Sequence, residues 1–142
     1  MSVAKPLPAK PLPEITPEMA PFWEAARRHE LAMQRCRGCG TLRFPARDIC
    51  SRCLSRSAEW APVSGRGTIF SFAVMHQVYH PGVADEVPYA VVLVELEEGG
   101  RLLSNVVGCP PAELTVGMPV EVVFEDRTPE VTLPTFRPRR PH

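Results

Sequence analysis

Four of the five cysteines in this chain form two pairs with the same internal spacing. Cys36 and Cys39 make the first C-x2-C pair and, after ten intervening residues, Cys50 and Cys53 make the second. One C-x2-C pair on a tight turn supplies two sulfur ligands, and two such pairs complete the tetrahedral sphere of zinc. Because the protein fills all four coordination positions, the spacing predicts a structural zinc ion and not a catalytic one.

Three other roles for these cysteines compete with zinc binding. Disulfides require an oxidising compartment, and the first residues lack the apolar stretch of a secretory signal, so we expect a cytoplasmic protein with reduced thiols. Redox chemistry by C-x-x-C favours one such pair at the start of a helix. Iron suits four tetrahedral sulfurs as zinc does, so iron stays open as the serious rival. Gly40 fits either metal, because glycine permits the positive φ of a metal-binding turn.

Few other side chains are placed for chemistry. His76 and His80 follow a predicted strand and could serve as an acid or base, although the plainer interpretation is loop histidines. Cys109 lies among apolar residues and is predicted to be a buried core cysteine. The sequence has no glycine-rich phosphate loop, no G-x-S-x-G and no H-E-x-x-H. We therefore predict no catalytic residues and a chain that is not an enzyme on its own.

The N-terminal region is predicted to be an arm followed by a helix, together residues 1–33. Residues 1–21 contain six prolines, which remove amide donors and keep the chain extended. A helix with an apolar face is predicted over residues 19–31. It starts either with Thr16 as N-cap and Pro17 at the first helical position, or at Pro21 itself.

The cysteines are positioned by a predicted zinc ribbon over residues 34–62, which has few bulky apolar residues and needs the metal to fold. After Gly67 the pattern changes to short β-branched and aromatic segments, predicted as strands over 68–75, 89–96, 102–107, 120–124 and 131–136. Five short strands predict a small barrel of the OB-fold type over residues 63–138, with a tail at 139–142. The fold class is therefore mainly β.

Charge divides the chain at the same place. Between residues 27 and 66 nine arginines face three acids, which with four zinc-bound thiolates leaves roughly +4. Between residues 67 and 126 one arginine faces nine acids, roughly −8. Single-strand binding needs a basic groove with aromatic platforms, so the acidic barrel disfavours nucleic acid, although the basic ribbon keeps it as an alternative. No apolar run approaches the length of a membrane span.

In this order, four segments resemble one known family over residues 13–138. They are PFWEAARRHELAMQRCRGCGTLRFPARDICSRC (21–53), EWAPVSGRGTIFSF (59–72), PYAVVLVELEEGGRLLSN (88–105) and VGMPVEVVFE (116–125). The chain resembles the zinc-ribbon/OB-fold family known as domain of unknown function 35, and the resemblance implies a rubredoxin-like ribbon. All four paired cysteines stand where that family has its metal ligands.

The resemblance implies a non-catalytic accessory subunit that binds a thiolase-superfamily enzyme. Such partners are thiolases, thiolase-like aldolases of steroid side-chain breakdown and acyltransferases, and the subunit supports their acyl-CoA chemistry. We expect a heterotetramer of two and two, with acyl-CoA as a ligand. Some relatives carry a fused hydratase-like domain, for which this chain is expected to be too short. The remaining alternative is a stand-alone acyl-CoA thioesterase that uses His76 or His80.

Six residues are predicted to contact the partner or coenzyme A. Aromatic side chains are enriched among interface hot spots, although two aromatics near the helix start could instead cap the thin core of the ribbon. Arginines on the ribbon suit an acidic enzyme surface or the phosphates of coenzyme A. The predicted contact residues are Phe22, Trp23, Arg47, Arg52, His76 and His80.

Overall fold

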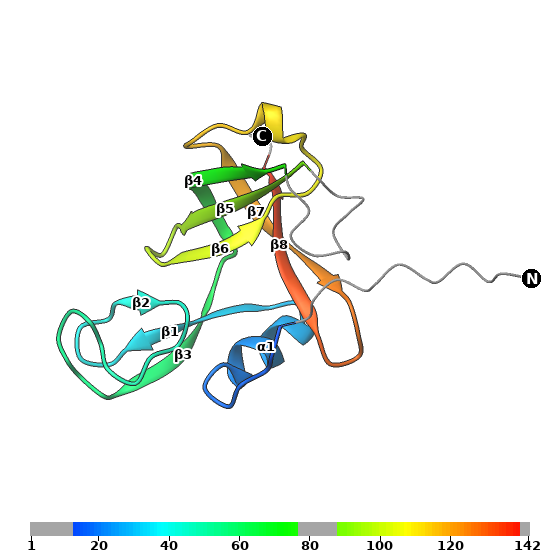
Figure 1. Ribbon diagram of the computed structural model, residues 1–142. Helices are drawn as coiled ribbons and strands as arrows, with labels where there is room; N and C mark the ends of the chain where they lie inside the picture. The colour runs from blue at the N-terminus through cyan, green and yellow to red at the C-terminus, as the bar shows by residue number, and fades with distance from the viewer. Residues whose placement is uncertain (1–12, 77–87, 140–142) are drawn as a thin grey trace, which may run out of the picture.

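The computed structural model describes residues 13–76 and 88–139, and this part of the chain is mainly β (Figure 1). A short helix, α1 (Ala20–Arg27), precedes a three-stranded antiparallel sheet in the order β2-β1-β3. Its strands are β1 (Leu31–Cys36), β2 (Leu42–Arg43) and β3 (Ala58–Val63). This sheet with its two cysteine loops forms the predicted zinc ribbon.

Helix α1 begins and ends with different local devices. The N–H of Met19 donates to the carbonyl of Thr16 (3.1 Å) in a preceding turn, and Pro21 lies in the first turn of the helix. The start near Pro21 is therefore the better of the two predictions. At the other end His29 adopts a left-handed conformation (φ 59°) and the N–H of Glu30 bonds to the carbonyl of Ala25 (2.9 Å). This is the usual pattern of a helix terminus that closes on a left-handed residue.

The prediction that the helix continues to Leu31 is wrong. The left-handed His29 turns the chain, and Leu31 opens β1 with its side chain buried. The apolar periodicity continued past the true end because the first buried residue of the strand happens to keep the helical spacing.

The second sheet has five strands in the order β6-β5-β4-β7-β8. They are β4 (Arg66–Met75), β5 (Tyr89–Leu96), β6 (Arg101–Asn105), β7 (Pro119–Asp126) and β8 (Thr132–Pro138), with a short 3-10 helix, η2 (Pro111–Glu113), before β7. Val106 pairs in parallel with Phe136, and the N–H of Val107 donates to the carbonyl of Phe136 (2.7 Å). This bridge brings the two edges of the sheet together, so the predicted five-stranded barrel is confirmed as a nearly closed one.

One apolar core runs through the ribbon and the barrel. Leu31 and Met33 of β1 belong to the same buried cluster as Val92, Val94 and Phe136 of the barrel. The β5–β6 hairpin approaches the ribbon so closely that a Cβ on Gly100 would lie 2.8 Å from the methyl carbon of Met33. A side chain at this hairpin tip would therefore have to displace the end of the Met33 side chain. The core that the ribbon lacks by itself is supplied by the barrel.

A polar contact also joins the end of α1 to the barrel. The ring of His29 stacks on Phe124 with 5.2 Å between centroids, and its Nε2 lies 3.0 Å from Oδ1 of Asp126. Asp126 also accepts a hydrogen bond from the hydroxyl of Thr132 (2.7 Å).

Within the described ranges, no helix is both long enough and apolar enough to cross a membrane.

Candidate metal centre

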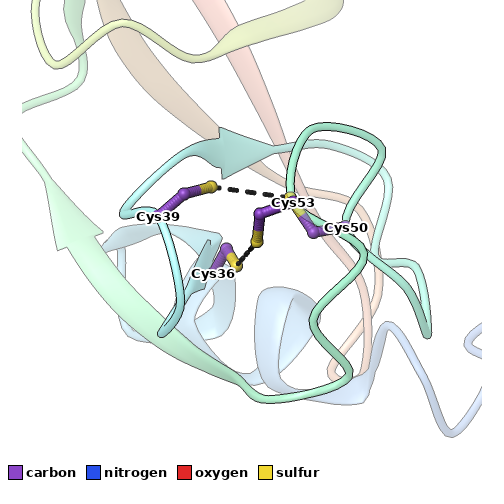
Figure 2. A group of neighbouring side chains, drawn as sticks. All are labelled: Cys36, Cys39, Cys50 and Cys53. Atoms are coloured by element: carbon purple, nitrogen blue, oxygen red, sulfur yellow. Dashed lines mark hydrogen bonds between the residues drawn. The ribbon is translucent and has the colours of Figure 1, made fainter.

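The four paired cysteines converge at one end of the ribbon (Figure 2). Their sulfur atoms all lie within 4.8 Å of one another, with 3.4 Å between Cys36 and Cys53 and 3.6 Å between Cys39 and Cys50. Four sulfurs at the zinc–sulfur distance of about 2.3 Å form a tetrahedron with edges of roughly 3.8 Å. The arrangement therefore fits a single zinc ion. None of the five cysteines forms a disulfide.

The two cysteine loops are built alike. In the first loop, the N–H of Gly40 donates to the carbonyl of Cys36 (2.9 Å), and in the second the N–H of Leu54 donates to the carbonyl of Cys50 (2.9 Å). The residue after the second cysteine is left-handed in both loops, with φ of 77° at Gly40 and 63° at Leu54. The same turn is thus used twice, once with the glycine that it favours and once with a leucine.

Backbone amides point at the sulfurs and favour the thiolate form. The N–H of Gly38 lies 3.3 Å from the sulfur of Cys36, and the N–H of Arg52 lies 3.4 Å from the sulfur of Cys50. The pKa of Cys36 is lowered to about 6, most of all by the backbone N–H of Cys39. The pKa of Cys50 is also lowered, chiefly by the backbone N–H of Cys53.

The pKa of Cys53 shows that the four crowded sulfurs lack a positive charge between them. The backbone N–H of Ser55 lowers the pKa of Cys53, but the neighbouring sulfur of Cys36 and then burial raise it, and the result is about 12. Four thiolates so close together repel one another unless a cation lies between them. A divalent ion held by Cys36, Cys39, Cys50 and Cys53 would supply that charge, and its role there is structural because no position is left open.

Sequence reasoning missed two residues of this centre. A Cβ on Gly38 would lie 3.0 Å from the Cβ of Ser55 and 3.1 Å from the sulfur of Cys53, so glycine lets the two loops meet. The position of this glycine inside a C-x2-C pair was the available signal. Leu54 carried no signal at all, because leucine does not indicate a left-handed backbone.

The predicted contact arginines lie at the surface of the ribbon. Arg47 and Arg52 are exposed, and no carboxylate among residues 13–76 and 88–139 forms an ion pair with either of them. Arg43 points inward instead, where its Nε donates to Gln34 and one of its terminal nitrogens donates to the carbonyl of Arg47 (2.9 Å). The exposed pair remains a prediction for partner contact.

The other predicted contact residues are scattered. Phe22 is only 2% exposed, and its ring lies 5.0 Å from each of the rings of Trp23 and Phe44. This burial favours the alternative interpretation, in which Phe22 closes the core of its own chain. Trp23 is half-buried, His76 is exposed directly after β4, and His80 lies outside the described residues.

Cys109 is half-buried and packs against the core, so it is less buried than the predicted buried core cysteine. Its sulfur lies 3.6 Å from the carbonyl of Pro110. Burial, and then the charge of Glu113, raise the pKa of this thiol. A raised pKa leaves less of the reactive thiolate, so nothing here favours Cys109 as a nucleophile.

Two family models match successive parts of the chain. Residues 23–59 match the rubredoxin-like zinc ribbon domain of ChsH2, and residues 60–125 match the C-terminal OB-fold domain of ChsH2. In a comparison of structures, the "Ltp2-ChsH2(DUF35) aldolase" is similar with a TM-score of 0.78 and 43% identity, covering 89% of this chain and 98% of that one.

Three curated relatives differ in length and name. A "probable enoyl-CoA hydratase alpha subunit" of Thermomonospora curvata is 42% identical over 96% of this chain, which spans 42% of that relative's length. A "DUF35 domain-containing scaffold protein" of Methanocaldococcus jannaschii is 38% identical over 68% of this chain and 69% of its own. The "benzoylsuccinyl-CoA thiolase subunit BbsA" of Thauera aromatica is 32% identical over 74% of this chain and 78% of its own.

Proposed function

Since the chain belongs to the DUF35 family, whose ChsH2-type members join a rubredoxin-like zinc ribbon to an OB-fold, we propose that it is a non-catalytic subunit of a thiolase-superfamily enzyme complex. In this role the chain binds the enzyme subunit and supports its acyl-CoA chemistry. A zinc ion held by the four paired cysteines keeps the ribbon folded.

The observation that carries the proposal is the match to the ChsH2 chain of the Ltp2 aldolase. The match extends over 98% of that chain at 43% identity, so ribbon and barrel occur together in both. The aldolase is named for two proteins, and ChsH2 is paired in it with Ltp2. The BbsA relative is likewise named as a subunit of a thiolase that acts on a coenzyme A ester. Both names support a partner that carries the chemistry.

The side chains support the same division of labour. A hydrolase acting alone on thioesters needs a nucleophile within reach of a base. Cys109 has a raised thiol pKa, and His76 is an exposed residue after β4.

We propose a heterotetramer of two and two, with the acyl-CoA bound by the complex.

Turnover assays on the isolated chain test the non-catalytic part of the proposal. Purified protein is incubated with a panel of saturated and enoyl-CoA thioesters, and released thiol and hydrated product are both measured. We expect neither to exceed the rate without protein. Steady thioester cleavage that disappears in His76→Ala or His80→Ala would establish the thioesterase alternative. Hydration of the enoyl esters would assign the activity named for the longer relatives to this part of the chain.

Recovery of the partner tests the remaining part. The full chain is isolated from its source cell at physiological salt, and the proteins that accompany it are identified by mass spectrometry. We expect a thiolase-superfamily enzyme in an amount equal to the chain. Recovery of nucleic acid in its place, with submicromolar single-strand binding that falls steeply with salt, would replace the proposal by the nucleic-acid alternative.

A further inference from the structure

The second cysteine loop carries an apolar side chain on a backbone that disfavours it. Leu54 has φ of 63°, in the left-handed region where a Cβ crowds the following carbonyl. Its counterpart in the first loop is Gly40, which takes the same conformation without strain. The fold of the loop therefore does not need a leucine at this position.

Burial does not compensate for this strain. Leu54 is 75% exposed, so its side chain contributes little to the core of the chain. Ile49, at the other end of the same loop, is 40% exposed. A single exposed leucine is ordinary, but an exposed leucine on a strained backbone is an outlier that points to a function.

Three arginines lie close to Leu54 in the sequence. Arg47, Arg52 and Arg56 are all exposed, and within the described part of the chain none of them forms an ion pair. A zinc ion with four thiolates carries two negative charges, which accounts for part of this arginine excess. It does not account for the two apolar side chains.

The barrel of a second copy is a weaker candidate partner for these cations, because several of its described acids already pair with arginines. Glu95 pairs with Arg101 (3.1 Å), Glu121 with Arg137 (2.9 Å) and Glu97 with Arg66 (3.3 Å). Residues 47–56 contain no aromatic side chain, so they also lack the stacking platforms that single-stranded nucleic acid needs. A protein surface with free carboxylates and an apolar pocket complements both features of the loop.

We propose that residues 47–56, here called the ribbon tip, dock on the partner enzyme by inserting Leu54 into an apolar pocket with an acidic rim. This inference rests on the proposed function and names the surface through which it operates. The strain at Leu54 is retained because binding, and not folding, uses the side chain.

The decisive variant is Leu54→Gly, which removes the side chain and relaxes the backbone together. Binding is measured by titrating the zinc-loaded full chain against the thiolase-superfamily enzyme recovered with it, or against the Ltp2 enzyme if none is recovered. We expect Leu54→Gly to bind at least about tenfold more weakly, while its zinc content is unchanged and its Tm does not fall. A side chain with a purely structural role would not weaken binding without lowering Tm.

Two further variants define the comparison. Val116→Asp changes an apolar residue of the barrel that is 68% exposed, and we expect it to bind like the unmodified chain. Arg52→Glu reverses a charge of the ribbon tip and should weaken binding most at low salt.

The outcomes separate a failure of this inference from a failure of the proposed function. If the unmodified chain binds the enzyme and Leu54→Gly binds equally well, the ribbon tip is not the docking element, although the proposed function survives. If the unmodified chain binds neither enzyme, the proposed function and this inference both fail. If vesicles containing anionic phospholipid retain the chain and lose it on Leu54→Gly, a lipid surface replaces the protein pocket.

Discussion

The ribbon and the barrel share one core, yet they are held together by different means. The barrel has its own apolar interior, to which Val92, Val94 and Phe136 each contribute a fully buried side chain. The ribbon contributes Leu31 and Met33 to that interior and has four sulfur ligands at its other end. The barrel is thus stabilised mainly by burial, whereas the outer part of the ribbon depends on a metal.

The charged side chains of the ribbon and the barrel also differ, in whether they have ion-pair partners within the chain. Acids of the barrel pair with arginines on neighbouring strands, as in Glu121 with Arg137, whereas Arg47, Arg52 and Arg56 of the ribbon have no ion-pair partner among the described residues. The difference suggests that the barrel is complete by itself and that the ribbon presents its charge to something else.

Removal of the metal should separate the two regions most strongly. We expect Cys36→Ser to lose the zinc, from about one ion per chain to nearly none, because binding and folding are coupled in such sites. Metal analysis and limited proteolysis measure the effect, with cleavage expected between Cys36 and Ala58. Cys109→Ser is the matched control and should keep its zinc. Unchanged proteolysis and thermal stability in a metal-free preparation would contradict a metal-dependent ribbon.

A change in the shared core should lower the stability of the chain without releasing its zinc. Phe136→Ala removes a fully buried aromatic ring and should lower the free energy of unfolding by about 3–5 kcal/mol. Under native conditions this variant should still bind about one zinc ion, because its cavity lies in the barrel. Denaturant unfolding and metal analysis together make the test, and loss of zinc without added denaturant would show that the regions cannot be separated.

The two cysteine loops allow the comparison to be made inside the ribbon itself. Leu54→Gly should stabilise the folded chain by about 1 kcal/mol, because it removes a side chain from a left-handed position. Gly40→Leu should destabilise the chain by about as much, since a Cβ at Gly40 would meet no other atom and only the backbone strain remains. Thermal unfolding of both variants measures the difference. If both variants changed the stability by equal amounts in the same direction, the two loops would not be equivalent.

The smallest effect is expected where α1 meets the barrel. Hydrogen bonds from Thr132, and then from His29, lower the pKa of Asp126 below its usual 3.8. A lowered pKa means that the stabilisation is present above that usual value and is lost as the pH falls through the lowered one. Asp126→Asn should therefore be less stable than the unmodified chain near about pH 6, and the difference in stability should be smaller near about pH 3. A difference in stability that stays constant between these pH values would show that the ionised carboxylate is not its cause.

The sequence allowed the metal centre and most strands to be predicted because both depend on local patterns. The spacing of the paired cysteines sets the arrangement of the ligands, and a run rich in β-branched and aromatic residues predicts β5 at its observed bounds. The left-handed residues His29 and Leu54 were not predicted, because histidine adopts that conformation only occasionally, although more often than most residues, and leucine does not indicate it at all. His29 ended the helix early and thereby changed the role of Leu31.

Contacts between side chains that are far apart in the sequence could not be predicted either. The pairing of Arg101 with Glu95 depends on the register of the β5–β6 hairpin, and the burial of Phe22 depends on how α1 lies over Phe44. The sequence predicted a basic ribbon and an acidic barrel correctly as totals. Only the structure distinguishes charges that are already paired from those that are free.

The mass of the complex in solution tests the proposed partnership most directly. The chain is co-expressed with the thiolase-superfamily enzyme from its source cell, and the product is analysed by size exclusion with light scattering at micromolar concentration. We expect one peak with the mass of two chains and two enzyme subunits, and about two zinc ions per complex. Separate peaks, with an enzyme that is equally active and soluble alone, would contradict the partnership.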